Sequence, residues 1–202
     1  MKKVIPVALA VLASPAIAEG TRQLDSHEHG VGELNIAIEG NNVVMELHAP
    51  GADIVGFEYA AESAEDRAAI DAAVATLARP LELFVVSAAA ECTVVQASAA
   101  LESEDGHEDH GDDHDHGEEH ADGHDDAHDH DEDHADEAGH TEFHAEYALN
   151  CRNTDALSEI TFAYFDAFEN ARELEVQIVS AAGAQAFEVE RDEPTLELRG
   201  MF

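Results

Sequence analysis

The stretch from residue 102 to residue 142 constrains this chain more than any other feature. It holds ten His and twenty Asp or Glu, and it lacks Lys, Arg, Val, Ile and Pro. A segment this charged cannot bury enough apolar surface to offset its chain entropy, so we expect it to be disordered without a ligand. Apolar patterning stops near Leu101 and resumes at Phe143. The sequence therefore predicts one small domain interrupted by a long loop at about 102–142.

Residues 1–18 have the three parts of a secretory signal peptide. Met1-Lys2-Lys3 is a charged start, an apolar run follows to Ile17, and Ala16-Ile17-Ala18 is a small-residue cleavage site. The apolar run is too short for a membrane-spanning helix, although an uncleaved anchor is the alternative. We expect cleavage after Ala18, a single domain over residues 19–202, a periplasmic location and no membrane insertion of the mature chain.

The formal net charge of −37 limits the kinds of molecule that the chain is expected to bind. Cleavage at the predicted site would remove both lysines and leave only Arg as basic residues. Nucleic acid and anionic membrane surfaces would repel such a chain, so neither is expected as a partner. The charge favours cations.

Two alternating segments predict a β-hairpin before the loop. Glu33–Ile38 and Val43–His48 each alternate apolar and polar residues, with Gly40-Asn41 between them as turn residues. The apolar positions are even-numbered in the first segment and odd-numbered in the second, so they share a face only if paired positions sum to an odd number. That register places Glu33 opposite His48 on the polar face.

One helix and several further strands follow from patterning. Ser63 with Asp66 is an approximate capping box, an apolar stripe runs from Ala69 to Leu77, and Arg79-Pro80 ends the helix. Alternation or short apolar runs indicate strands at Leu81–Val86, Cys92–Ala97, Phe143–Cys151, Ile160–Phe165, Leu174–Ser180 and Ala186–Val189. In the segment after the loop, Glu142, His144 and Glu146 share the polar face. We expect an α+β fold: an antiparallel β-sheet or sandwich with one principal helix, and the loop inserted between two strands.

Cys92 and Cys151 are the only cysteines. Two cysteines in an exported chain suggest one disulfide, while two unpaired buried thiols are the alternative. The strands that flank the loop are natural antiparallel neighbours, so we expect the disulfide to staple the base of the loop. Closing roughly 60 residues is worth about 4 kcal/mol in the chain-entropy model.

The loop histidines indicate metal binding. Imidazole suits zinc, copper and nickel, and several imidazoles on one chain act as a chelate because each further ligand arrives at high effective concentration. Their spacing varies, which predicts several labile zinc ions and no single tetrahedral site; nickel or copper are alternatives, as is a solvated acidic linker. The candidate ligands are His107, His110, His114, His116, His120, His124, His128, His130, His134 and His140.

The four remaining histidines could form an ordered zinc site. His27 and His29 share a strand face if that segment is extended, and His48 and His144 each lie on a predicted polar face. Independent surface histidines are the alternative. The chain lacks G-x-S-x-G and H-E-x-x-H motifs and has no lone Cys beside a His, so we expect it not to be an enzyme.

Two stretches resemble the ZrgA family of zinc-binding periplasmic proteins, namely His27–Gly40 and Glu46–Glu58. The most specific parts are the His-x-His-Gly start and Asp53–Glu58. Members of the family also carry a signal peptide, a central His/Asp/Glu-rich loop and flanking cysteines, so the likeness covers essentially the whole mature chain. The loop histidines do not align residue by residue. The resemblance implies a role in zinc starvation alongside an ABC-type zinc importer.

Three functions are then open. The first is a periplasmic zinc-binding accessory protein that captures zinc, supports high-affinity uptake and passes zinc to the solute-binding protein of an ABC importer. The second is a passive buffer or detoxifier for zinc, nickel or copper, for which growth defects would appear in metal excess and not in starvation. The third is a metal-dependent hydrolase built on His27, His29 and His48, which metal-dependent turnover of an ester or phosphate substrate would reveal.

Overall fold

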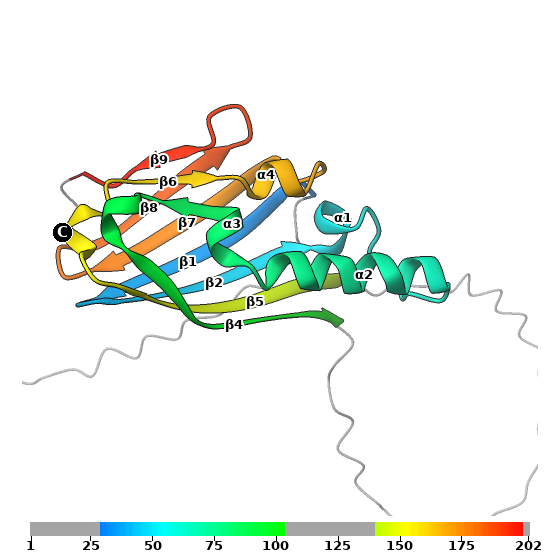
Figure 1. The fold of residues 1–202 in the computed structure, drawn as a ribbon. Helices are drawn as coiled ribbons and strands as arrows, with labels where there is room; N and C mark the ends of the chain where they lie inside the picture. Colours follow the sequence, from blue (N-terminus) through cyan, green and yellow to red (C-terminus); the bar gives the residue numbers. More distant parts are fainter. Residues whose placement is uncertain (1–28, 104–139, 200–202) are drawn as a thin grey trace, which may run out of the picture.

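The computed structural model describes residues 29–103 and 140–199 (Figure 1). The predicted signal peptide, His27 and the nine loop histidines from His107 to His134 lie outside the described residues. A six-stranded sheet has the order β4 (Cys92–Ser103), β5 (Thr141–Cys151), β2 (Asn42–Pro50), β1 (Val31–Glu39), β7 (Glu173–Ser180) and β8 (Gly183–Glu190). A smaller sheet contains β3 (Phe84–Val86), β6 (Glu159–Phe162) and β9 (Thr195–Glu197).

The predicted α+β class is confirmed at the level of a β-rich chain with few helices. Helix α2 (Ala64–Leu77) is the longest described helix. The other described α-helices are α1 (Gly51–Ile54), α3 (Pro80–Leu83) and α4 (Tyr164–Ala167), and the described 3-10 helices are η1 (Ala88–Ala90) and η2 (Thr154–Ala156). The capping box that starts α2 is confirmed, because the Asp66 N–H donates to Ser63 Oγ at 2.9 Å and the Ser63 N–H donates to the Asp66 carboxylate at 3.1 Å.

The larger sheet is mixed and not purely antiparallel, which corrects the expected architecture. The β1–β2 hairpin has the predicted register, with Glu33 opposite His48, and β5 pairs antiparallel with both β2 and β4. Strand β7, however, runs parallel to β1. The chain returns through β6 and α4 to the end of the sheet where β1 begins, and the N–H groups of Arg172 and Glu173 donate to the Gly30 carbonyl there. A long crossover connection of this kind can place β7 parallel to β1, whereas a tight hairpin joins only antiparallel strands.

Two predicted strands are wrong in part. The segment Leu81–Val86 begins as helix α3 and becomes β3 only at Phe84, and the segment Ile160–Phe165 leaves β6 after Phe162 to enter α4. Pro80 stands in the first turn of α3, where its fixed φ favours a helical start. Short apolar runs do not distinguish a buried strand from a buried helical turn, which is why patterning alone failed here.

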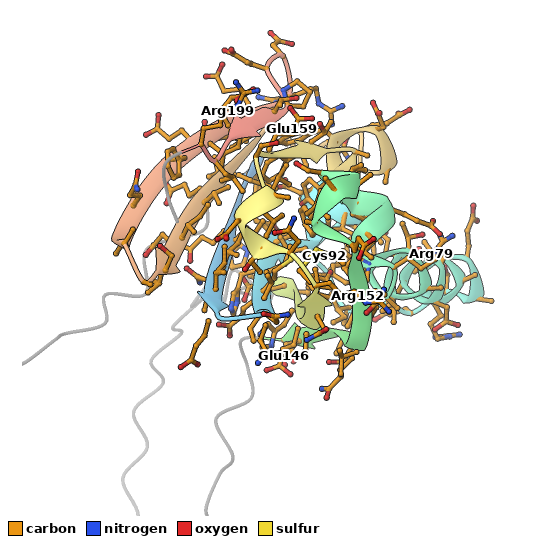
Figure 2. All side chains as sticks on the ribbon, turned by 60° about the vertical axis from the view of Figure 1, so that its left-hand side comes forward. Arg79, Cys92, Glu146, Arg152, Glu159 and Arg199 are labelled. Atoms are coloured by element: carbon orange, nitrogen blue, oxygen red, sulfur yellow. A yellow bond between two sulfur atoms is a disulfide. The ribbon has the colours of Figure 1, made fainter. Side chains whose placement is uncertain are left out.

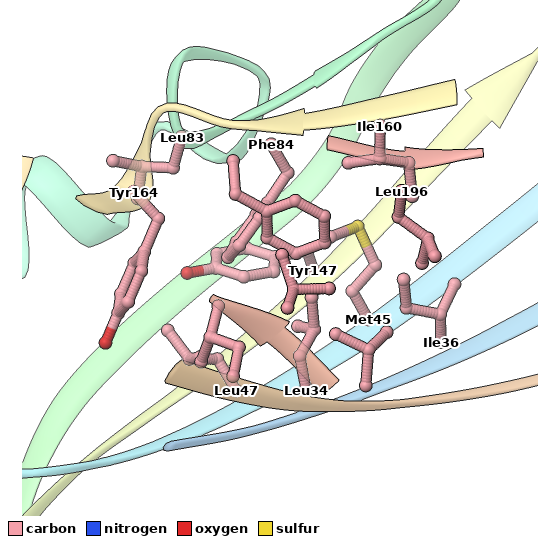
Figure 3. Close-up of a cluster of buried hydrophobic side chains, with 14 of the residues drawn as sticks. Leu34, Ile36, Met45, Leu47, Leu83, Phe84, Tyr147, Ile160, Tyr164 and Leu196 are labelled. Atoms are coloured by element: carbon pink, nitrogen blue, oxygen red, sulfur yellow. The ribbon is translucent and has the colours of Figure 1, made fainter. Parts of the chain in front are cut away.

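The core lies between the inner face of the larger sheet and the smaller sheet with its short helices (Figure 3). Leu34, Met45 and Tyr147 from the larger sheet meet Phe84 and Ile160 of the smaller sheet, and all five are almost fully buried. The alternation that buries one face of β1, β2 and β5 leaves the other face polar. The histidines and carboxylates of these strands therefore share one outer face.

The predicted disulfide between Cys92 and Cys151 is present, but it does not lie at the base of the loop. The two cysteines pair at the start of β4 and the end of β5, whereas residues 104–139 leave from the opposite end of these strands, beyond the Ser103–Thr141 pair. Strand β4 continues to Ser103 and is twice as long as patterning indicated. A full ladder of strand pairs therefore separates the disulfide, near Cys92 in Figure 2, from the loop.

Helix α1 packs closely against the start of β5. A Cβ at Gly51 would lie 2.5 Å from Thr141 Oγ1 and 2.7 Å from the Phe57 carbonyl oxygen, and backbone atoms cannot yield as a side chain can. Gly51→Ala is therefore expected to cost about 1–3 kcal/mol, as overpacking does, in urea unfolding. Gly40→Asn is the control, because Gly40 has a left-handed φ of 58° that Asn tolerates and open space around it. Equal stability of wild type and Gly51→Ala would contradict this packing.

Candidate metal centre

One end of the larger sheet collects the described histidines. Strands β1 and β5 begin at this end, and β2 and β4 end there. His48 of β2 stands directly opposite His144 of β5, while His29 and His140 lie just before β1 and β5. Residues 29, 48, 140 and 144 are therefore brought to one end of the fold from three separate segments of the chain.

Glu46, His48 and His144 form what we call the strand cluster. One potential ligand atom from each residue lies within 4.8 Å of the other two. Nε2 of His48 is 3.4 Å and Nε2 of His144 is 3.2 Å from Oε1 of Glu46. The two imidazole rings stack with centroids 4.4 Å apart and planes at 22°. This proximity follows from the register, since directly opposed residues on one face of an antiparallel pair are nearest neighbours.

A second carboxylate faces the other nitrogen of each imidazole. Nδ1 of His48 donates to Oε2 of Glu142 at 3.3 Å, and Nδ1 of His144 lies 3.6 Å from Oε1 of Glu102. Glu102 and Glu142 are themselves paired across β4 and β5. In metal sites, a carboxylate on the far nitrogen orients the ring and makes the metal-facing nitrogen more basic. The Nε2 atoms of both histidines are left directed at Glu46.

Contacts between histidines and carboxylates shift the pKa values of His48 and Glu46. The hydrogen bond to Glu142, with a further contribution from Glu46, raises the pKa of His48 to about 9 against the opposing effect of burial. Burial by itself would raise the pKa of Glu46, but hydrogen bonds and charge from His48 and His144 outweigh it and hold that pKa below its ordinary value. Glu46 is therefore an ionised carboxylate at neutral pH.

The spacing of the strand cluster suits zinc. Tetrahedral zinc with nitrogen and oxygen ligands at about 2.0–2.2 Å keeps neighbouring ligand atoms roughly 3.3 Å apart. The two distances from His48 and His144 to Glu46, 3.4 and 3.2 Å, are close to that value. Three protein ligands leave a fourth position for water or another donor. The side chains of His48 and His144 are 30% and 22% exposed, so this position is accessible from solvent.

Of the four histidines predicted for an ordered site, the three that the structure describes do not share one cluster. His48 and His144 meet in the strand cluster. His29 lies in a turn before β1 and not in an extended segment, and it contacts Glu58. His140, predicted as a loop ligand, contacts the same Glu58. His27 lies outside the described residues. His48 and His144 thus belong to the strand cluster, and His29 and His140 belong to a second cluster around Glu58.

The carboxylates of both clusters were missed as candidate ligands. A signal existed for the strand cluster, since Glu46-Leu47-His48 and Glu142-Phe143-His144 repeat the pattern Glu-x-His, which places both polar side chains on one strand face. Glu58 belongs to the Asp53–Glu58 stretch that carries the family resemblance, but no spacing pattern linked it to a histidine. It lies in the connection between α1 and α2, and only the folded chain places it beside His29 and His140.

The fold and the strand cluster together define a β-rich protein with a His/carboxylate surface site of the kind that holds a divalent transition metal. The chain belongs to the ZrgA family of zinc uptake proteins, whose family model matches residues 26–198. This confirms the family that the sequence resembles and a role in zinc uptake. No match to an individual curated protein was found. Among residues 29–103 and 140–199, no helix has the length and apolar character needed to cross a membrane.

Proposed function

We propose that this protein is a periplasmic zinc-binding accessory protein, and that the strand cluster is its ordered zinc site. The observation that carries the proposal is the direct pairing of His48 with His144 over Glu46, with Glu142 and Glu102 on the outer nitrogens. Imidazole with carboxylate is a zinc-type ligand set, and membership of a zinc uptake family favours zinc over nickel or copper.

The geometry supports capture and release more than permanent structural binding. Structural zinc sites are closed by four protein ligands, whereas the strand cluster supplies three from an open sheet face. An incoming donor from a partner protein could occupy the remaining position before the zinc leaves. The proposed role is binding and delivery, with no catalytic step.

The predicted loop ligands complement this site. The described residues that flank 104–139 lie at the same end of the sheet as this site, because Ser103 and Thr141 form the last described pair of β4 and β5. Loosely bound zinc on the loop imidazoles would be held at high effective concentration near Glu46, His48 and His144. Loop histidines thus collect several ions in this proposal, and the strand cluster holds one of them more tightly.

The experiment that tests the ordered site is a competition titration of the full chain with a zinc chelator. Replacing His48 and His144 together with Asn is expected to weaken the tightest zinc by at least tenfold, because even partners outside the ligand shell typically contribute 10–100-fold. Glu46→Gln should weaken it in the same direction. The matched control is Glu175→Gln, which removes the same charge from the same sheet face two strands away from His48.

Unchanged tight binding in the chain with Glu46→Gln, His48→Asn and His144→Asn would remove the strand cluster as the zinc site. Delivery needs a separate measurement. Transfer of zinc from the loaded full chain to the solute-binding protein of a zinc importer should outpace release to a small chelator. Equal rates would leave a passive zinc buffer.

A further inference from the structure

We propose that His29, Glu58 and His140 form a second zinc site, which we call the junction cluster. The inference rests on the proposed zinc-binding function but uses none of the residues of the strand cluster. It assigns a role to Glu58, a carboxylate in the α1–α2 connection that sequence patterning did not single out.

The junction cluster is a carboxylate held between two imidazoles. Nε2 of His29 is 3.1 Å from Oε1 of Glu58, and Nδ1 of His140 is 2.8 Å from Oε2 of the same carboxylate. The Glu58 side chain is 14% exposed, whereas the side chains of His29 and His140 are 66% and 60% exposed. The carboxylate is therefore largely enclosed by the fold. The ligand atoms of these three residues do not all lie within 4.8 Å of one another, as those of the strand cluster do, so the two exposed imidazoles must turn toward a shared ion.

The carboxylate of Asp53 lines the same small pocket as His29 of the junction cluster. Asp53 is 2% exposed, and its Oδ1 accepts a hydrogen bond from the Gly30 N–H at 2.7 Å. Within the described part of the chain, its Oδ2 is buried and has no hydrogen-bond partner. Asp53 lines a small pocket together with His29 and Arg172. A buried carboxylate oxygen left unpartnered is costly, and a bound cation beside His29 reduces that cost.

Zinc would take the place of protons in the junction cluster. In the metal-free protein, each imidazole must present an N–H to Glu58, because a carboxylate can only accept. Binding of one Zn²⁺ replaces those N–H contacts by two nitrogen–zinc bonds and one carboxylate–zinc bond and releases any proton the metal displaces. The ligand set of two imidazoles and one carboxylate matches that of the strand cluster.

The three ligands come from three separate segments. His29 precedes β1, Glu58 follows α1, and His140 precedes β5. A zinc ion here would therefore cross-link the starts of two sheet strands to the α1–α2 connection. Such a site exists only in the folded chain, so zinc bound to it raises the melting temperature. Histidines contiguous in sequence can bind zinc in the unfolded chain as well and stabilise the fold less.

The test measures the zinc-induced rise in melting temperature of the full chain. In the variant with Glu46→Gln, His48→Asn and His144→Asn, part of the rise should remain. Adding Glu58→Gln to this variant should remove most of the remainder, and so should adding His29→Asn with His140→Asn. Glu62→Gln is the matched control, since Glu62 is exposed in the same connection. Circular dichroism of each metal-free variant establishes that it is folded before zinc is added.

Hydrogen exchange supplies a second readout. Zinc should slow exchange of the backbone amides around Glu58 and His140 in the variant that lacks the strand cluster. No remaining temperature rise and no such protection would overturn the junction cluster while leaving the proposed function intact. A wild-type rise unchanged by Glu46→Gln, His48→Asn and His144→Asn, yet lost with Glu58→Gln, would support the junction cluster and reject the strand cluster.

Discussion

The protein in which Cys92 and Cys151 are both replaced by Ala is expected to lose about 4 kcal/mol of unfolding free energy relative to the oxidised wild type. The disulfide joins residues 59 apart, and the stretch that it encloses includes all of residues 104–139. Without the cross-link, the unfolded chain regains the freedom of this long segment. Urea unfolding of both proteins without metal measures the difference.

Wild type under reducing conditions is the control for the double cysteine variant and should show a similar loss. Zinc affinity, measured where both proteins are folded, should change little, because six β4–β5 residue pairs separate the disulfide from His144. A loss below about 1 kcal/mol would mean that the reduced, unfolded chain keeps the two strands close together.

Zinc affinity at the strand cluster is expected to rise about tenfold per pH unit below pH 9, or roughly a hundredfold between pH 6 and pH 8. The hydrogen bond to Glu142 raises the pKa of His48 to about 9, so a proton must leave this imidazole before zinc can bind. The same hydrogen bond makes the deprotonated Nε2 a stronger ligand. Competition titrations of the full chain at several pH values measure the slope.

Stability of the metal-free protein should follow the opposite trend. Because the folded pKa of His48 lies above its ordinary value of 6.5, its contribution to stability is complete below about pH 6.5 and disappears as the pH rises through about 9. His48→Asn should remove this contribution and reduce the slope of zinc affinity by about one proton. A zinc affinity independent of pH in wild type would show that His48 is not a ligand.

The local sequence was enough to predict each strand face of the candidate site. Alternation in Glu33–Ile38 and Val43–His48, with the turn between them, determined the hairpin register and placed His48 on the polar face. The same reasoning placed Glu142 and His144 on one face of their strand. Patterning failed at α3 and α4, where short apolar runs fit a strand and a helical turn equally well.

The sequence by itself determined the family, the faces of the strands and which residue types could hold zinc. Only the tertiary structure decided which ligands meet. His48 and His144 face each other because β5 pairs with β2 in one register. These strands are far apart in the chain, since 94 residues separate His48 from its partner Glu142, and packing of the whole sheet aligns them. Folding likewise places Glu58, from the α1–α2 connection, beside His29 and His140. Local patterning describes only neighbours along the chain, whereas both proposed zinc sites need contacts between distant segments.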